Sequence, residues 1–490
     1  MYARLTSFFD SNNSIYSRQY GFRSQHSCEH ALMDAQNTIL KTLNNKHIAL
    51  LLLIDFSKAF DMVDHGILLS KLAGYGIRGA ALSWLESYLS NRTQYVNVNC
   101  TNSSSLKLLY GVPQGSILGP LLFVIYINDL PSICPDVHFI LYADDANIIV
   151  TGTDLADIKT KINHLLIKLQ EWVNLNSLKL NVKKTHYMIF SNAKNKKEFN
   201  LNLKLNSEVI FQSHEERFLG VIMDDKLSWV SHRAAIRTRI SRNAGIFFRA
   251  RHMFKTKTLK SLYFSFIQAH LVFCCSIWGI GSKNSLRDIF VAQKRAVRAI
   301  SFTKLYTKNE ETQAYSYGHT KPIFKALGIL TIHNLILTQL LSQMHKIYSL
   351  SAPVYTRSLF SAHYPPSPEP VWVSNPSPRN VDINTSNILQ SNETHLTFYA
   401  VPTARLAQQR QSLVYIGPLL YNHFVNKAQN NIDDKYKLHK FTPKSFSGRI
   451  KYELLSVQST GSVDLWENTN TPMYSINTSS VTTRSQRATT

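Results

Sequence analysis

Cysteine, long apolar runs and acidic side chains are all scarce in this chain of 490 residues. Its five cysteines are an odd and scattered set, which argues against a disulfide framework. No Cys-x-x-Cys stretch is matched by a second pair of cysteines or histidines, so the sequence predicts no zinc site. No apolar run reaches the roughly 18 to 20 residues that cross a bilayer, and the N-terminus lacks the apolar core of a signal peptide. These absences predict an intracellular protein, in the nucleus or the cytoplasm, with no membrane-spanning segment.

The charge of the chain is strongly unbalanced. It has 54 lysines and arginines against 31 aspartates and glutamates, a formal net charge of +23. A basic surplus of this size favours a polyanionic partner, with nucleic acid as the leading class. A membrane surface is the weaker alternative, because no basic amphipathic helix stands out at a terminus.

The most informative stretch is Leu141–Ile149, which holds two adjacent aspartates between apolar segments. Residues 139–141 and 148–150 have the composition of strands, and aspartate favours turns. We therefore expect a hairpin with Asp144 and Asp145 at its tip. Because successive side chains of a strand point to opposite faces, one aspartate should face a site and the other should lie at its edge. A solvated turn is the ordinary alternative.

A third carboxylate follows an apolar run of strand length, residues 47–54, which ends at Asp55. A carboxylate at the end of a buried strand is costly unless it is paired or bound to a metal. Three carboxylates on adjacent strands suit two Mg²⁺ ions, with Mn²⁺ as a substitute, because these ions prefer oxygen ligands. Two such ions stabilise both the attacking and the leaving oxygen of an in-line phosphoryl transfer.

These two stretches resemble motifs A and C of the reverse transcriptases of retrotransposons that lack long terminal repeats. A third segment, Gly111–Phe123, resembles motif B, and its local sequence is similar to that of jockey-type elements. The resemblance implies an α+β right-hand polymerase with an antiparallel palm sheet, partial fingers and a helical thumb, followed by a helical C-terminal region. It also implies RNA-directed DNA synthesis, with an RNA template, a DNA primer and deoxynucleoside triphosphates (dNTPs) as partners.

The same resemblance divides the chain into domains. Residues 1–46 are expected to form partial fingers, 47–230 the palm with inserted fingers elements, and 231–350 the thumb and its extension. The remaining segments are a Pro- and Ser-rich linker, a region like the C-terminus of such elements, and a disordered Ser-, Thr- and Asn-rich tail: 351–395, 396–455 and 456–490.

Periodicity adds local predictions. An amphipathic helix over 154–176 should cover the back of the sheet, and motif B should open a helix over 117–130. Strands at 93–98 and 106–110 should pair across a polar turn at 102–105. Residues 194–206, which are polar and lysine-rich, are expected to form a loop and an exposed strand.

The resemblance assigns roles to five residues around the aspartates. Arg23 would meet the triphosphate of the incoming nucleotide, and Phe60 would exclude a 2′-hydroxyl from beneath its sugar. Gln114 and Gly115 would line the nucleotide pocket, where the glycine permits close backbone approach. Lys184, in a stretch like motif D, would be the general acid for the leaving pyrophosphate. The ordinary alternatives are a surface arginine, a core aromatic, a helix-entry turn and a solvated lysine.

Two further groups are expected to contact nucleic acid. Phe218, Leu219 and Gly220 resemble motif E, which supports the primer end. On the predicted thumb helices, cations one turn apart share a face from which they would contact phosphates. These pairs are Arg233 with Arg237 and Lys294 with Arg298. A solvated row of charges is the alternative for each pair.

Two other interpretations compete with this one. The first is an intron-type maturase, and the local sequence of the motifs argues against it. The second is a catalytically inactive or fragmentary relic that binds nucleic acid without synthesis. The short fingers segment favours a relic, because the family normally has more sequence there and the chain is expected to be truncated at its N-terminus. The presence of all three aspartates argues against it.

Overall fold

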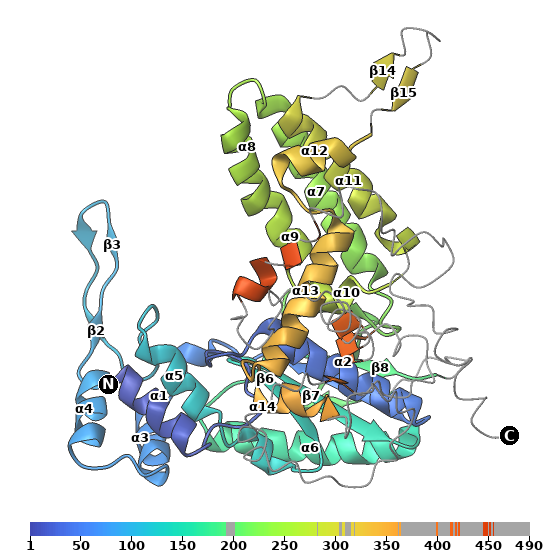
Figure 1. Cartoon of the computed structure of the whole chain (residues 1–490). Coiled ribbons are helices and arrows are strands. Elements are labelled where there is room, and N and C mark those ends of the chain that lie inside the picture. The colour runs from blue at the N-terminus through green and yellow to red at the C-terminus, as the bar shows by residue number, and fades with distance from the viewer. Residues whose placement is uncertain are drawn as a thin grey trace, which may run out of the picture. The chain divides into compact units, whose positions relative to one another are not determined.

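The computed structural model in Figure 1 describes residues 1–192, 201–281, 283–302 and 319–360, together with short stretches between 306 and 317 and between 362 and 454. The chain divides into two compact units, Met1–Lys226 and Leu227–Thr490. Helices and a sheet together make up the first unit, so the predicted α+β class is confirmed.

A five-stranded sheet with the order β11-β8-β1-β7-β6 forms the centre of the first unit. Its strands are β1 (Ile48–Ile54), β6 (His138–Tyr142), β7 (Asp145–Gly152), β8 (His186–Phe190) and β11 (Phe211–Gln212). Neighbouring strands are antiparallel, except that β11 runs parallel to β8. β1 is apolar along its whole length because it pairs on both sides and is buried on both faces, and the strand predicted over residues 47–54 is confirmed from Ile48 onward.

Helices cover both faces of this sheet. On one face, α6 (Leu155–Leu175) shares a core with Leu50 and Leu52 of β1, as the amphipathic pattern predicts. Asp154 caps α6 by accepting a hydrogen bond from the Asp157 amide at 2.9 Å. Alternate residues of β1 point the other way, where α2 (Cys28–Asn44) contacts β1, β6 and β7.

Helices and short strands around the sheet complete the first unit. The helices are α1 (Tyr2–Ser11), α3 (His65–Gly74), α4 (Ala80–Leu89) and α5 (Leu118–Tyr126), with 3₁₀ turns η1 (Ala59–Asp61), η2 (Leu130–Ile133) and η3 (Val182–Lys184). The short strands are β2 (Thr93–Gln94), β3 (Asn97–Val98), β4 (Thr101–Asn102), β5 (Leu106–Lys107), β9 (Lys204–Leu205), β10 (Glu208–Val209), β12 (Glu215–Phe218) and β13 (Val221–Asp224).

Three local predictions need correction. The motif B helix ends at Tyr126, and a 3₁₀ turn at Leu130–Ile133 follows after three turn residues. The ribbon β2–β5 turns at Asn99 and Cys100, both of which have positive φ, so the turn does not lie at 102–105. Leu201, Leu203 and Leu205 are buried, so the strand expected to be exposed packs one face into the core; residues 194–200 lie outside the described residues.

The second unit is mainly helical where it is described. Its elements are α7 (Val230–Ala250), α8 (Thr256–Tyr263), a π-helical turn η4 (Phe264–Gln268), α9 (Ala269–Val272), α10 (Cys275–Trp278), α11 (Lys283–Ser301), α12 (Lys321–Leu327), α13 (Ile332–Tyr348), α14 (Val354–Ser358), β14 (Tyr306–Lys308), β15 (Tyr315–Tyr317), β16 (Ala362–His363) and β17 (Phe398–Tyr399). The predicted linker and C-terminal region fall largely outside the described residues, and the predicted tail wholly so.

No single helix among the described residues is both long and apolar enough to cross a membrane. α12 and α13 satisfy the length and composition test only as a pair, and that pair is bent by 52°.

Candidate active site

The two adjacent aspartates lie on the hairpin that joins β6 to β7, as predicted. Tyr142 pairs with Asp145, so Ala143 and Asp144 form a two-residue turn. Ala143 has a φ of +57°, a left-handed conformation that is uncommon for a residue with a side chain. The two aspartates are not equivalent, since half-buried Asp144 belongs to the turn and Asp145 is the first residue of β7.

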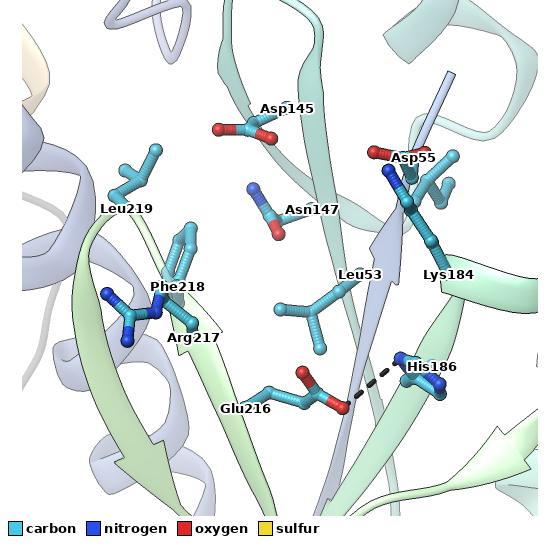
Figure 2. Close-up of a pocket in the computed structure, with 11 residues that line it drawn as sticks. Leu53, Asp55, Asp145, Asn147, Lys184, His186, Glu216, Arg217, Phe218 and Leu219 are labelled. Atoms are coloured by element: carbon cyan, nitrogen blue, oxygen red, sulfur yellow. Dashed lines mark ion pairs between the residues drawn. The ribbon is translucent and has the colours of Figure 1, made fainter. Parts of the chain in front are cut away.

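A pocket of about 280 Å³ lies beside this hairpin, entirely within the first unit. Figure 2 shows Asp55 and Asp145 at one end of the pocket and an ion pair between His186 and Glu216 at the other. Nδ1 of His186 lies 3.2 Å from Oε1 of Glu216. The other lining residues come from the end of β1, the start of β7, the 3₁₀ turn η3 and the β12–β13 hairpin: Leu53, Ile54, Asn147, Lys184, Arg217, Phe218 and Leu219.

Asp55 is held at the end of β1 by backbone pairing beyond the sheet. Its carbonyl accepts a hydrogen bond from the Asn181 amide at 2.8 Å, and the Ser57 amide donates to the Lys179 carbonyl at 2.8 Å. This pairing places the residues before η3 beside the end of β1. As a result Lys184, at the end of η3, lines the same pocket as Asp55.

The carboxylates destabilise one another's charge. Asp145 is open to solvent on one side, yet the protein around it desolvates the carboxylate and, with the charges of Asp144 and Asp55, raises its pKa to about 6. Desolvation and the charge of Asp55 also raise the pKa of Asp144. Among the described residues, none of the three aspartates forms an ion pair with a cation. The three aspartates therefore concentrate negative charge that no ion pair in the described part of the chain offsets.

The chemistry of this donor set fits hard divalent cations, which take carboxylate oxygens and offset like charges. The side chains as placed do not yet form a ligand cage, because no three His, Cys, Asp or Glu side chains in the described part of the chain are arranged to hold a metal ion. The expected ligands Asp55, Asp144 and Asp145 are near enough to repel one another. Their assignment as ligands stays a prediction.

The motif E segment also reaches the pocket. Phe218 ends β12 and is 2% exposed, while Leu219 and Gly220 form the turn to β13 with φ of +47° and +84°. Phe218 and Leu219 line the pocket, whereas Gly220 supplies the left-handed backbone that this turn needs.

The residues expected to bind the nucleotide do not line this pocket. Arg23 is tied to the N-terminal segment, where Nη1 donates to the Tyr16 carbonyl at 3.1 Å and Nη2 lies 3.9 Å from the Asp10 carboxylate. Burial lowers the pKa of Arg23. Phe60 stacks on Phe123 with ring centroids 4.6 Å apart, which makes it part of the core next to the site.

Gln114 and Gly115 lie in the loop that precedes α5. Nε2 of Gln114 donates to the Asp61 carboxylate at 2.7 Å. Gly115 has a φ of +82°, and a Cβ there would meet no other atom within 4 Å. Within the described protein, then, this glycine is explained by its backbone conformation and not by close packing of the chain.

The four thumb cations sit on two helices of the second unit that contact each other, α7 and α11. Nη2 of Arg233 donates to the Ser228 carbonyl at 2.7 Å, and Arg237 lies 3.7 Å from the Asp288 carboxylate. Nζ of Lys294 lies over the Phe290 ring at 4.6 Å, and burial together with Arg298 and Arg287 lowers its pKa. Local contacts thus engage Arg233, Arg237 and Lys294, and a role of these cations toward nucleic acid stays a prediction.

Sequence reasoning missed Asn147, His186, Glu216 and Arg217 as pocket residues. Asn147 is 3% exposed, and its Nδ2 has no hydrogen-bond partner in the described part of the protein. Strand alternation alone was enough to find it, because it lies two residues after Asp145 on β7 and therefore on the same face. The other three depend on how β12 meets β8, which no local pattern shows.

The sequence was compared with known families and proteins. Residues 1–223 match the family described as reverse transcriptase (RNA-dependent DNA polymerase). The chain is 27% identical over 321 residues to the RNA-directed DNA polymerase from mobile element jockey of Drosophila melanogaster, covering 63% of this chain and 34% of that protein. It is likewise 27% identical over 323 residues to the probable RNA-directed DNA polymerase from transposon BS of the same species, covering 62% and 34%.

The chain thus spans about a third of the length of these curated relatives. Among solved structures, a telomerase from Candida albicans matches 69% of this chain and 51% of its own at 14% identity, with a TM-score of 0.39. A likeness this slight carries no argument about the fold. The predicted resemblance to reverse transcriptases of jockey-type elements is confirmed by the family match and the curated relatives.

Proposed function

Because residues 1–223 match the reverse transcriptase family, we propose that this chain is the RNA-directed DNA polymerase of a retrotransposon. It would transfer a nucleotide from a dNTP to the 3′-hydroxyl of a DNA primer on an RNA template. The observation that best supports the proposal is the convergence of Asp55, Asp144 and Asp145, where desolvation and the neighbouring carboxylates raise the pKa of both Asp144 and Asp145. Such a concentration of like charge with raised pKa values is typical of functional sites.

Asp55, Asp144 and Asp145 would hold two Mg²⁺ ions, which supply charge neutralisation for an in-line phosphoryl transfer. The remaining work is positioning, which dominates phosphoryl transfer. Leu219 would offer apolar contact to the primer end from the β12–β13 hairpin, and the nearly buried Phe218 would support that hairpin. Lys184 lines the same pocket as Asp55, and as the general acid it would hold the proton that the leaving pyrophosphate takes.

The nucleotide would lie against the motif A and B segments next to the pocket. The stacking of Phe60 on Phe123 fixes the Phe60 ring, which supports a role for it in excluding a 2′-hydroxyl. Gln114 and Gly115 would line the same place. Arg23 would have to leave the Tyr16 carbonyl to reach a triphosphate, so its role is the least supported.

The proposal extends to the domains and the second unit. Residues 1–46, 47–230 and 231–350 would serve as fingers, palm and thumb. The α7 and α11 cations would contact phosphates of the template–primer duplex, which position it without reading its sequence.

Primer extension on an RNA template tests the proposal, with wild type compared to a double variant, Asp144→Asn with Asp145→Asn. We expect extension to fall at least about a hundredfold, because both changes remove charge that acts on the reacting phosphate. Binding of template–primer should change by less than about threefold, since phosphate contacts supply most affinity. Asp136→Asn is the control, as it removes an exposed aspartate of the same unit outside the pocket.

A different function is also open to this test. If neither protein extends the primer with Mg²⁺ or Mn²⁺ while both still bind it, the chain is a nucleic-acid-binding relic and the polymerase proposal is wrong. Extension that is equal in the wild type and the double variant would place the chemistry elsewhere.

A further inference from the structure

The turn that carries Asp144 is contacted from outside its own hairpin by one buried side chain. Gln19 is 1% exposed, and its Oε1 accepts hydrogen bonds from two backbone amides, Gly21 at 2.8 Å and Ala143 at 3.2 Å. Ala143 is the residue of the turn with the left-handed φ of +57°. A single carboxamide oxygen therefore joins the N-terminal segment to the strained position of the turn.

The backbone around Gln19 adds a strand-like edge to β6. The Leu141 amide donates to the Arg18 carbonyl at 3.0 Å, and the Tyr20 amide donates to the Leu141 carbonyl at 2.7 Å. Gln19 and Leu141 form a parallel bridge between these two bonds. The outer edge of β6 is thus paired up to two residues before Ala143, and Gln19 extends the pairing to the turn itself.

Gly21 brings the two backbones into direct contact. A Cβ at Gly21 would lie 2.4 Å from the Ala143 amide nitrogen and 2.9 Å from the Tyr142 carbonyl carbon. These are backbone atoms that have no free rotation by which to move away. Only glycine allows the N-terminal segment to approach the turn this closely.

A buried polar network holds the same segment to the body of the first unit. The Tyr20 hydroxyl donates to the Asp34 carboxylate at 2.9 Å, and Nε2 of His138 lies 2.8 Å from the other oxygen of that carboxylate. Asp34 is 1% exposed and belongs to α2, while His138 begins β6. The contact at Gln19 is therefore backed by α2 and β6, so a shift of the segment would disturb buried, paired groups.

We propose that Gln19 is a positioning residue for nucleotidyl transfer, which fixes the Ala143–Asp144 turn and so the orientation of the aspartates. This inference rests on the proposed function for its activity readout, but its physical content is a restraint on one backbone amide. A left-handed alanine persists only when its surroundings hold it. In the absence of the Gln19 acceptor, the Ala143 amide would be buried without this partner, and the turn would relax toward other conformations.

The variant Gln19→Met tests the inference, because methionine has nearly the same length and no strong acceptor. We expect kcat for primer extension to fall about ten- to a hundredfold, since small misplacement of reacting groups has effects of that size. KM for the dNTP should stay within about threefold, because Gln19 is not among the residues that line the pocket. Amide hydrogen exchange at Ala143, resolved by fragmentation mass spectrometry, should accelerate at least about fivefold.

Asn128→Leu is the matched control. Asn128 is also a carboxamide that holds the N-terminal segment, since its Oδ1 accepts from the Tyr16 amide and its Nδ2 donates to the Ser14 carbonyl, both at 2.7 Å. It makes no hydrogen bond to the turn among those described. This variant should lose stability comparably, yet keep kcat within about threefold and the Ala143 exchange rate unchanged. If Gln19→Met does not fold, Gln19→Asn keeps the amide but is one methylene too short to reach Ala143.

Equal losses of kcat in the two variants, or unchanged exchange at Ala143 in the Gln19 variant, would overturn the inference. A wild-type chain that extends no primer would reject the polymerase proposal alone, because the exchange comparison between the two variants still decides whether Gln19 restrains the turn.

Discussion

Two hairpin turns of two residues each border the same pocket, and they are built in opposite ways. The β12–β13 turn consists of Leu219 and Gly220, which both have positive φ. The β6–β7 turn consists of Ala143 and Asp144, of which only Ala143 has positive φ. The first turn has the backbone that matches the twist of its own strands and a glycine to adopt it. The second has no glycine, and Gln19 of a distant segment contacts it.

The β12–β13 turn therefore depends on its own residues, whereas the β6–β7 turn also has a supporting contact from the N-terminal segment. A left-handed alanine costs roughly 1 to 2 kcal/mol relative to a relaxed backbone. The aspartates beside it add an electrostatic cost, because desolvation and the charges of Asp144 and Asp55 together raise the pKa of Asp145. A left-handed residue with a side chain occurs in both turns, Ala143 in one and Leu219 in the other, but the like charge lies at the turn that we propose to be catalytic. The turn proposed to support the primer carries neither carboxylates nor an external restraint among the described contacts.

The largest expected effect comes from adding a side-chain atom at Gly21, where the N-terminal segment packs against the proposed catalytic turn. In Gly21→Ala the new Cβ would lie 2.4 Å from the Ala143 amide nitrogen, so one of the two backbones has to move. We expect primer extension to fall about a hundredfold or more and the free energy of unfolding to fall by roughly 1 to 3 kcal/mol, as in overpacked cores. Extension assays and urea denaturation measure the two effects.

Gly74→Ala serves as the control for this change. Gly74 ends α3 in the same unit, and a Cβ there would meet nothing within 4 Å. Its activity and stability should remain close to those of the wild type. A Gly21→Ala protein with wild-type extension would show that the proposed catalytic turn tolerates displacement, which would remove the contrast between the two turns.

A smaller effect is expected at the glycine of the other turn. In Gly220→Ala, a residue with a side chain is forced to a φ of +84°, so we expect the free energy of unfolding to fall by about 1 kcal/mol. Because asparagine tolerates the left-handed region better, Gly220→Asn should recover most of that loss. Primer extension should fall less than about fivefold in either variant, since the lining residues Phe218 and Leu219 are kept. A loss as large as that of Gly21→Ala would mean that both turns need equally strict geometry.

The sequence alone predicted the parts of the fold that depend on local periodicity. The apolar run before Asp55, the hairpin around Asp144 and the amphipathic face of α6 all follow from residues close together in the chain. Where a pattern is short, it misleads. Polar neighbours hide the alternation of Leu201, Leu203 and Leu205, so the burial of these leucines was not predicted. In the β2–β5 ribbon each pair of strands matches over only two residues, which is too short a pattern to predict that the turn lies at Asn99 and Cys100.

The contacts that distinguish the two turns were beyond any local pattern. Gln19 and Ala143 are separated by 124 positions, and their hydrogen bond depends on how the N-terminal segment docks on β6. The position of Arg23 was equally unpredictable. Its guanidinium donates a hydrogen bond to the Tyr16 carbonyl of its own segment, and the residue types do not indicate this contact. Residue types thus predict which groups carry the chemistry, while tertiary docking decides which of them are held in place.

The smallest expected effect sharpens the electrostatic half of the comparison. The pKa of Asp145 is raised to about 6 from an ordinary value of 3.8, so between these values the folded protein binds a proton that the unfolded chain does not. Its ionisation therefore costs stability above about pH 6, and that cost disappears as the pH falls toward 4. In metal-free buffer at pH 7.5, Asp145→Asn should raise the free energy of unfolding by about 0.5 to 1 kcal/mol, a figure reduced for partial exposure to solvent.

This gain in the free energy of unfolding should vanish near pH 4, because Asp145 of the folded wild type is then protonated and carries no charge for the substitution to remove. Urea denaturation of both proteins across this range, in the presence of a chelator, measures the difference. Excess Mg²⁺ at pH 7.5 should reverse its sign, because a cation offsets the repulsion among carboxylates only where they are kept. The two proteins could instead have the same free energy of unfolding at every pH, with and without Mg²⁺. In that case the charge of Asp145 does not destabilise the proposed catalytic turn, and this turn differs from the β12–β13 turn only in backbone conformation and in its contact with Gln19.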